Sequence, residues 1–222
     1  MSYILVFDFD GTLVDSMEHL AKIASRILTS HYGLSTEISR DLYFKTSGLP
    51  FEEQIELMFP NHKSNKEAVA HFEREKENTI FKQPLFLEVK NIFSAMSAAG
   101  HKLVVSSSNI QSILVEYFLR ADLKIDLILG YKKGFSKGKA HFDYIKKYFR
   151  VRDDKSVFFI GDSLKDYQRA KDNGVTFIAR SGTFTVEELE KAGVKCIIEN
   201  LTELPNIISV FFKRNDVRHH DV

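Results

Sequence analysis

Six short apolar runs recur along the sequence, and stretches with a helical period separate most of them. Each run has the length of a buried strand, and the intervening pattern, such as Leu114, Tyr117 and Phe118, repeats as on an amphipathic helix. The runs are residues 3–7, 102–106, 126–129, 157–160, 175–178 and 195–198. This alternation predicts an α/β fold, a doubly wound parallel sheet with helices on both faces.

The interval between the first two runs breaks the alternation. Residues 16–84 contain helical patterns, including an amphipathic stripe that begins at Leu20, and no convincing strand. We therefore predict an all-helical cap over residues 16–84, inserted into an α/β core formed by residues 1–15 and 85–212. Residues 213–222 are polar and lack apolar periodicity, so they are predicted to form a disordered tail.

Composition excludes several classes of protein. The 222 residues include 31 Lys and Arg against 30 Asp and Glu, which gives no case for a nucleic-acid or anionic-membrane partner. The single cysteine, Cys196, allows no internal disulfide and suits a reducing cytosol. No run approaches the roughly 18 apolar residues of a membrane span, and the N-terminus shows no basic leader. We expect a cytoplasmic protein, and the sequence does not specify its oligomeric state.

Two aspartates directly follow the first apolar run. Asp8 and Asp10 stand one residue apart where the strand ends, and residues i and i+2 of a strand share a face. Two carboxylates this close repel each other unless a cation, a shared proton or different chemical roles separate them. The pattern therefore predicts a bound ligand at this strand end.

Polar residues also follow other predicted strands, at the sheet edge where open α/β proteins bind ligands. The second run leads into serines and an asparagine ahead of a helix, where hydroxyl and N–H groups suit an anion. The fourth run leads into Gly-Asp-Ser-Leu-Lys-Asp. Lys137 stands just before the helix that is predicted ahead of this run. The candidate residues are Asp8, Asp10, Ser107, Ser108, Asn109, Lys137, Asp162 and Asp166.

Each of these residues taken alone has an ordinary structural explanation. Ser107 could simply cap a helix, and Asp162 and Asp166 could be acids favoured in a first helical turn. Lys137 alone could be a solvated surface charge. Together at one sheet edge, however, they describe a magnesium-dependent phosphoryl site, because Mg²⁺ takes oxygen ligands from carboxylates, water and phosphate.

The same residues resemble the motifs of the haloacid dehalogenase superfamily of aspartyl-phosphate phosphatases, in the branch with a helical cap. The resemblance extends from Ile4 to about Phe212. The first motif, Asp-x-Asp-Gly-Thr, is complete at residues 8–12, and the fourth, Gly-Asp-Ser-x-x-Asp, is complete at residues 161–166. The first motif is highly specific to the superfamily.

The second and third motifs are matched less fully. The second, a Ser or Thr closing a hydrophobic strand, is assigned to Ser107, although Ser106 and Ser108 leave the register open by one position. The third, a lysine, is assigned to Lys137, with Lys139 as the alternative register. The Lys-Pro pair usual in the family is absent here.

The resemblance implies a role for each candidate residue. Asp8 would be the nucleophile that forms an aspartyl phosphate, and Asp10 the general acid and then the general base. Mg²⁺ would be held by Asp8, the Asp10 main-chain carbonyl and Asp162, with Asp166 orienting its outer shell. Substrate binding is assigned to Ser107, Ser108, Asn109, Lys137 and Lys45.

Relatives within the superfamily are distinguished by single positions. Haloacid dehalogenases and phosphonoacetaldehyde hydrolases lack the acid that stands here at Asp10. Lys45 resembles the cap lysine of the latter enzymes, and we interpret it as a substrate contact or an ordinary surface lysine. The β-phosphoglucomutases carry a catalytic cap histidine where Leu20 stands, and the neighbouring His19 would point elsewhere.

The best interpretation is a phosphatase acting on a small phosphorylated metabolite, in the phosphoglycolate-phosphatase-like branch, which Gly48-Leu49-Pro50 in the cap also resembles. A β-phosphoglucomutase-like phosphomutase is the first alternative. A phospho-accepting receiver domain is the second, but it would need its acid after the third strand, where this chain has Leu129 and Gly130.

Overall fold

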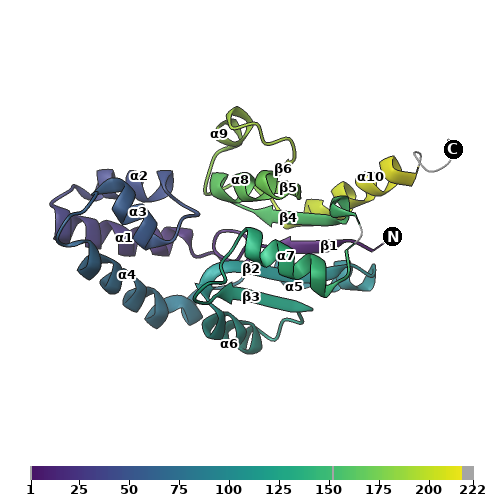
Figure 1. The fold of residues 1–222 in the computed structure, drawn as a ribbon, viewed down its shortest axis with the longest axis horizontal. Helices are drawn as coiled ribbons and strands as arrows, with labels where there is room; N and C mark the ends of the chain where they lie inside the picture. Colours follow the sequence, from purple (N-terminus) through teal and green to yellow (C-terminus); the bar gives the residue numbers. More distant parts are fainter. Residues whose placement is uncertain (1, 152, 217–222) are drawn as a thin grey trace.

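A six-stranded parallel sheet forms the centre of the protein (Figure 1). The computed structural model describes residues 2–151 and 153–216. The strand order is β3-β2-β1-β4-β5-β6, and every neighbouring pair is parallel. The strands are β1 (Ile4–Phe7), β2 (Lys102–Ile110), β3 (Leu127–Tyr131), β4 (Val157–Gly161), β5 (Thr176–Arg180) and β6 (Ile197–Ile198). All six correspond to the predicted apolar runs, so the parallel α/β prediction is confirmed.

The strand β1 lies between β2 and β4 and is buried on both faces. Leu5 and Phe7 belong to the apolar cluster on one face, whereas Ile4 and Val6 belong to the cluster on the other. A strand buried on both faces cannot alternate apolar with polar residues, which explains the continuous apolar run in the sequence.

Helices cover both faces of the sheet, as a doubly wound fold requires. Phe93, Phe118 and Ile208 pack into the cluster that contains Phe7. They come from α5 (Val89–Ala98), α6 (Gln111–Ala121) and α10 (Leu204–Asp216). The opposite face is covered by α7 (Lys139–Tyr148), α8 (Leu164–Asp172) and α9 (Val186–Lys191). The short 3₁₀ turns η2 (Asp154–Ser156) and η3 (Leu201–Glu203) precede β4 and α10.

The chain between β1 and α5 forms a helical lobe beside the carboxyl edge of the sheet (Figure 1). It contains α1 (Met17–Tyr32), α2 (Thr36–Lys45), α3 (Phe51–Met58), α4 (Asn65–Thr79) and the 3₁₀ turn η1 (Ile80–Lys82). The lobe has its own apolar core, in which Leu20 and Ile27 of α1 meet Phe51 and Phe72. The amphipathic stripe read from the sequence therefore faces the lobe and not the sheet.

Two adjacent chain segments join the lobe to the sheet. The Asp15 amide donates to the Pro84 carbonyl at 3.0 Å, and the Phe86 amide donates to the Leu13 carbonyl at 3.0 Å. Between these bonds Val14 pairs with Leu85 in an antiparallel bridge. The chain thus leaves and re-enters the α/β part at one point.

The last helix is longer than the sequence pattern indicates. The helix α10 continues to Asp216, into the segment expected to be a tail from residue 213, and the rest of that expected tail lies outside the described residues. None of the helices in the described part of the chain has the length and apolar character needed to cross a bilayer.

Candidate active site

Two acids meet where the strand order changes direction. Asp8 follows β1, and its amide donates to the Ile160 carbonyl of β4 at 2.8 Å. Asp162 follows β4, which lies on the opposite side of β1 from β2. Ligands of open α/β sheets bind at such a switch point, outside the carboxyl ends of the strands. Carboxylate oxygens of Asp8, Asp162 and Asp166 all lie within 4.8 Å of one another, and all three residues are buried.

Lys137 is a buried cation that contacts two acids of this cluster. Its ammonium lies 2.7 Å from Asp8 Oδ1 and 2.7 Å from Asp166 Oδ1, with the lysine side chain only 4% exposed. Lys139, the alternative from the sequence, begins α7 and pairs with Asp143 on the surface. The structure therefore brings Lys137 to the acids and leaves Lys139 in solvent.

The pKa shifts in the cluster follow from burial and charge. Burial raises the pKa of Asp8 well above its usual range, against the opposing effect of Lys137. Burial and the neighbouring Asp166 raise the pKa of Asp162 to about 7. Burial would also raise the pKa of Asp166, but the charges of Lys137 and Arg169 outweigh it and lower that pKa. Carboxylates crowded in this way favour an added cation.

The residues present fit a divalent metal ion. Three carboxylates form the hard oxygen donor set that such cations prefer. Among the described residues, the buried Oδ2 atom of Asp166 has no hydrogen-bond partner. Gly11 has a φ of +71°, and a Cβ there would lie 2.2 Å from Asp162 Oδ2, so a larger residue would displace that carboxylate. The cluster can therefore hold a divalent cation.

Asp10 is held by two donors from different parts of the chain. Ser16 Oγ donates to Asp10 Oδ1 at 2.6 Å, and Asn109 Nδ2 donates to Asp10 Oδ2 at 2.7 Å. Asn109 Nδ2 also lies 3.1 Å from Ser107 Oγ. The Asn109 amide therefore links Asp10 to Ser107, and its expected contact with substrate stays a prediction. Its geometry is that of a positioning residue.

The three serines near the end of β2 differ in where they point. Ser107 and Ser108 line a cavity with Asp8, whereas Ser106 is bonded to His141 Nδ1 at 2.9 Å below the sheet edge. The pairing of β2 with β3 is irregular between Ser106 and Ile110, which lets the chain turn the next serines toward the acids. Of the three serines that the sequence left open, Ser107 and Ser108 line the cavity and Ser106 does not.

The cavity over the acids has a volume of about 90 Å³ and lies between the sheet edge and the helical lobe. Asp8, Asp10, Ser107, Lys137 and Asp162 form its floor. The lobe contributes the apolar side chains of Met17, Leu20, Tyr43, Phe51 and Phe72. Such a lid excludes water and strengthens the charge interactions beneath it.

Lys45 is a sequence candidate that lies on the surface, outside this cavity. It is the last residue of α2, is exposed, and does not line the cavity. The helix ends there, and the following loop, Ser47 to Pro50, lines the cavity instead. This short loop turns the backbone away from the direction of the Lys45 side chain. The sequence pattern does not reveal such a turn.

That loop packs closely on the start of α8. Gly48 has a φ of +88°, and a Cβ there would lie 2.3 Å from Ser163 Oγ. The guanidinium of Arg169 donates to the Gly48 carbonyl at 2.9 Å and lies 3.1 Å from Asp166 Oδ1. One side chain therefore connects the helical lobe to the acidic cluster.

Four residues that support the acids were not found from the sequence. Thr12 and Thr183 donate hydroxyl hydrogen bonds to Asp162, the former at 3.4 Å. Ser16 holds Asp10, and Arg169 holds Asp166. Arg169 could have been found, because it follows Asp166 by three residues on one helix. Thr183 comes from the loop after β5, and no local pattern indicates its contact.

These features define a class of protein: an α/β enzyme whose parallel sheet carries an acidic site under an inserted helical lobe. The Haloacid dehalogenase-like hydrolase family model matches residues 5–180. The chain belongs to this family. Comparison with curated proteins gave no match.

Solved structures share the fold over nearly the whole chain. A predicted phosphatase from Clostridium acetobutylicum is 23% identical with a TM-score of 0.79, covering 94% of this chain and 99% of that one. A haloacid dehalogenase-like hydrolase from Streptococcus pneumoniae is 19% identical with a TM-score of 0.77, covering 93% and 98%. A predicted phosphoglycolate phosphatase from Haemophilus somnus is 20% identical with a TM-score of 0.70, covering 93% and 98%.

Proposed function

We propose that the protein is a Mg²⁺-dependent phosphatase that hydrolyses a small phosphorylated metabolite through an aspartyl phosphate on Asp8. The observation that carries this proposal is the pairing of Asp8 with Lys137 in a buried cavity. A carboxylate held beside a fixed ammonium is positioned to meet an anionic phosphoryl group. The name of one structural relative, a predicted phosphoglycolate phosphatase, makes phosphoglycolate one candidate substrate, and sugar phosphates are a second.

The first step transfers the phosphoryl group to the enzyme. An Asp8 carboxylate oxygen attacks phosphorus, and the bond from phosphorus to the ester oxygen breaks with its electron pair leaving on that oxygen. Asp10 donates a proton to the leaving oxygen. Ser107 and Lys137 bind the non-bridging oxygens, where negative charge accumulates in the transition state.

The second step returns the enzyme to its starting state. A water oxygen attacks the phosphorus of the aspartyl phosphate and loses its proton to Asp10, which now acts as base. The bond between phosphorus and the Asp8 oxygen breaks, and the electron pair stays on the carboxylate. Inorganic phosphate is released, Asp8 is again ionised and Asp10 is again protonated.

The acidic cluster would hold the metal ion. Asp8, the main-chain carbonyl of Asp10 and Asp162 are its proposed ligands, and Asp166 is proposed to orient its outer shell. When bound, Mg²⁺ supplies the positive charge that lets an anionic carboxylate approach an anionic phosphate. The raised pKa values of Asp8 and Asp162 support a need for that charge.

The helical lobe, residues 16–84, is proposed to be a cap that moves as a unit. Its hinges would be residues 14–16 and 83–85, where the two joining segments lie side by side. A closing cap admits small metabolites and excludes folded phosphoproteins. The balanced charge and the single cysteine support a cytoplasmic enzyme without a nucleic-acid partner.

The phosphomutase alternative is disfavoured by the cavity lining. Leu20 lines the cavity at the position where the mutases have their catalytic histidine. The neighbouring His19 is bonded to Thr79 on α4 at 2.8 Å. A leucine cannot exchange protons with a sugar hydroxyl, so water is the acceptor expected here.

The experiment is a phosphate-release screen of phosphorylated metabolites with Mg²⁺, run on the wild type, Asp8→Asn and Asp143→Asn. We expect Asp8→Asn to be inactive and folded, since the amide keeps the size of the carboxylate but cannot attack phosphorus. Asp143 is exposed on α7 and serves as the matched control. Activity of Asp8→Asn within about tenfold of wild type would contradict the assignment.

A further inference from the structure

A second cavity of about 310 Å³ opens beside the catalytic one, and we call it the leaving-group groove. Its walls come from α3 and α4 of the lobe and from the chain around the ends of β2 and β3. Pro50, Glu73, Lys76 and Ser108 line both cavities, so the two adjoin. The groove is therefore reached directly from the position above Asp8.

The small size of the catalytic cavity favours a second compartment for the leaving group. Sites for drug-sized molecules typically measure about 300–1,000 Å³. The catalytic cavity of about 90 Å³ is far below that range, whereas the groove of about 310 Å³ lies at its lower end. The groove adjoins the catalytic cavity and offers room for the leaving group of a phosphate ester held at Asp8.

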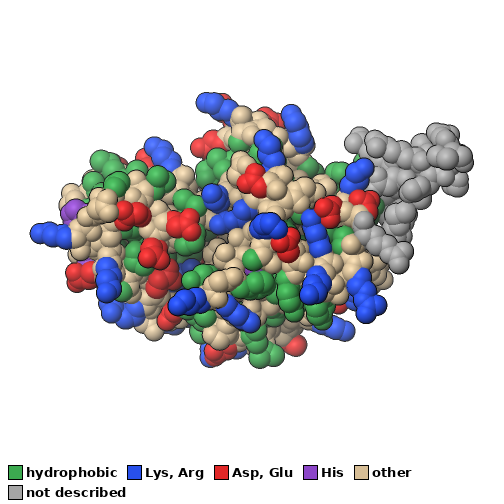
Figure 2. All heavy atoms as spheres, viewed as in Figure 1, with side chains coloured by type: hydrophobic (Ala, Val, Ile, Leu, Met, Phe, Trp, Pro, Cys, Tyr) green, Lys and Arg blue, Asp and Glu red, His purple; other side chains and the backbone are tan. Residues whose placement is uncertain are grey.

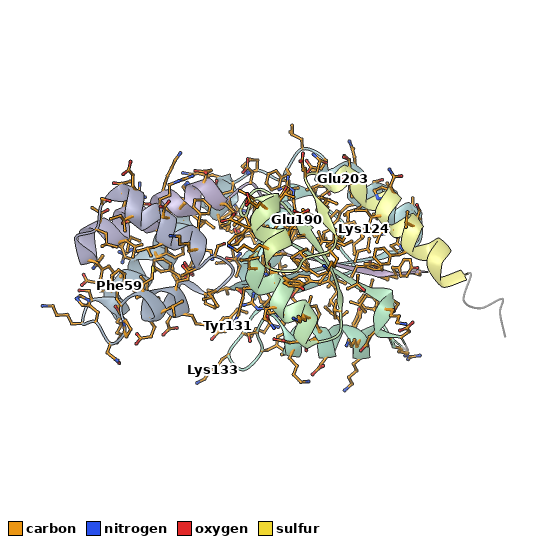
Figure 3. All side chains as sticks on the ribbon, turned by 90° about the horizontal axis from the view of Figure 1, so that it is seen from above. Phe59, Lys124, Tyr131, Lys133, Glu190 and Glu203 are labelled. Carbon is orange, nitrogen blue, oxygen red and sulfur yellow. The ribbon has the colours of Figure 1, made fainter. Side chains whose placement is uncertain are left out.

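The floor of the groove is apolar. Ile110 and Tyr131 contribute side chains that are 42% and 47% exposed, and Ile113 lies beside them. Val69 and Ile80 face them from the lobe. Figure 3 shows Tyr131 on the end of the core that faces the helical lobe. Exposed apolar side chains gathered at one cavity favour a ligand with an apolar body.

The rim of the groove is strongly acidic. Glu52 and Glu53 come from α3, and Glu73 and Glu77 come from α4, with Lys76 as the one cation among the groove's described lining residues. None of these four carboxylates makes an ion pair or hydrogen bond with another described residue. Figure 2 shows acidic side chains over α3 and α4 on the lobe.

Helix stability explains only half of these glutamates. Glu52 and Glu53 stand in the first turn of α3, where an acid interacts favourably with the helix dipole. Glu77 stands in the last turn of α4, where the same dipole disfavours an acid, and Glu73 lies one turn earlier. Glu77 is thus placed against the dipole of its own helix, and neither Glu73 nor Glu77 forms an ion pair with a described residue.

We propose that this groove selects phosphate esters whose leaving group has a compact apolar body and a cationic ammonium end. The inference rests on the proposed phosphatase function and names its substrate class. An ammonium group is attracted by the glutamates and can contact the face of Tyr131. A leaving group that carries a carboxylate, as in phosphoglycolate, meets the like charges of the four glutamates and the opposite charge of Lys76.

The test compares two substrates of similar size and opposite terminal charge, O-phosphoethanolamine and 2-phosphoglycolate. Their kcat/KM values are measured by phosphate release, with p-nitrophenyl phosphate as an independent measure of the chemistry. We expect the wild type to prefer phosphoethanolamine by about tenfold or more at low salt, and the preference to shrink as salt rises, because exposed charges are screened.

The glutamates are tested in the double variant Glu73→Gln with Glu77→Gln. The preference is expected to fall by about fivefold or more, mainly through a higher KM for phosphoethanolamine. Glu67→Gln is the matched control, since Glu67 is an exposed glutamate of α4 that lines neither cavity. Its preference should stay within about twofold of wild type.

The outcomes separate the two proposals. No hydrolysis of p-nitrophenyl phosphate would contradict the phosphatase function itself. Hydrolysis of that ester without a preference for phosphoethanolamine would overturn the groove inference and leave the phosphatase standing. An unchanged preference in the folded double variant would also overturn it. If the double variant does not fold, the salt dependence of the wild type decides, because a preference that is insensitive to salt contradicts selection by the glutamates.

Discussion

The ammonium of Lys137 lies 2.7 Å from Oδ1 of Asp8, and both side chains are almost fully buried. Burial alone would lower the pKa of Lys137, but Asp166 and Asp8 outweigh it and raise that pKa, so the lysine stays charged. We predict that Lys137→Gln lowers kcat/KM by about 100-fold or more, because a fixed donor to the transferring phosphoryl group is lost. Phosphate release under substrate-limiting conditions measures this.

The matched control for that lysine is Lys139→Gln. Lys139 is exposed and, within the described part of the chain, pairs only with Asp143, so its loss should change kcat/KM by less than about twofold. Equal effects of the two substitutions would show that position 137 has no special role. Lys137→Gln should also lower the free energy of unfolding by about 3 kcal/mol, since Asp8 and Asp166 lose their shared partner.

The contact between Ser16 and Asp10 predicts a dependence on the leaving group. Ser16→Ala should lower the rate with alkyl phosphates by about tenfold, because the hydroxyl that positions Asp10 is lost. Asp10→Asn should lower it by about 100-fold or more. With p-nitrophenyl phosphate the first step needs no proton, so Asp10→Asn should accumulate the phosphoenzyme, seen as added mass after rapid quenching.

Ser30→Ala is the control for Ser16, because Ser30 is an exposed serine of α1, the helix that Ser16 precedes. It should hydrolyse both kinds of ester at the wild-type rate. If Asp10→Asn also hydrolyses both at that rate, Asp10 is a structural acid and takes no part in proton transfer.

The contacts of Arg169 predict that the position of the helical lobe is coupled to the acidic site. Arg169→Met removes the hydrogen bond to the Gly48 carbonyl and one partner of Asp166. We expect KM to rise by about tenfold, because the closed position of the lobe loses a charged hydrogen bond. Gln168→Met on the same helix α8 is exposed and should leave KM unchanged. A loss of kcat with KM unchanged would contradict the link to closure.

The raised pKa of Asp162 predicts that thermal stability depends on pH and that Mg²⁺ changes this dependence. Its folded-state pKa of about 7 lies above its ordinary 3.8, so its contribution to stability in chelator is lost as pH rises from about 4 through 7. Mg²⁺ should therefore raise Tm more at pH 8 than at pH 5. Asp162→Asn should raise Tm in chelator at pH 8 and abolish the Mg²⁺ effect. Melting curves with and without Mg²⁺ test both statements.

The buried His141 predicts a loss of stability in acid. Burial and the charge of Lys137 lower the pKa of His141 to about 4. Its contribution to stability is present above its ordinary 6.5 and is lost as pH falls through about 4, by about 3 kcal/mol at most. Denaturant unfolding at pH 7.5 and 4.5 should show a smaller pH dependence in His141→Gln than in wild type. His31→Gln, near the surface of α1, should match wild type in this respect.

The sequence determined the architecture because its signal is local. A strand buried on both faces must be apolar throughout, and β1 is such a run. A helix with one buried face must show a stripe, and Leu20 to Leu28 is such a stripe. Asp8 and Asp162 could be expected to meet because the carboxyl ends of parallel strands share one edge of a sheet. None of these expectations needs a distance between residues remote in sequence.

The tertiary structure decided what depends on such distances. It brings Lys137 rather than Lys139 to Asp8, turns Asn109 toward Asp10, and leaves Lys45 outside the cavity. These outcomes depend on how loops bend after their strands and helices end, and a loop carries no periodic pattern from which a direction can be read.

The contacts between the lobe and the α/β part could not be predicted from the sequence either. The bond from Arg169 to the Gly48 carbonyl and the groove between Glu73 and Tyr131 join segments that the chain order separates widely. Their positions follow from how the helical lobe, with its own apolar core, packs against the α/β part of the chain. Local patterns specify each core, but only the folded chain specifies how the surfaces of the two cores meet.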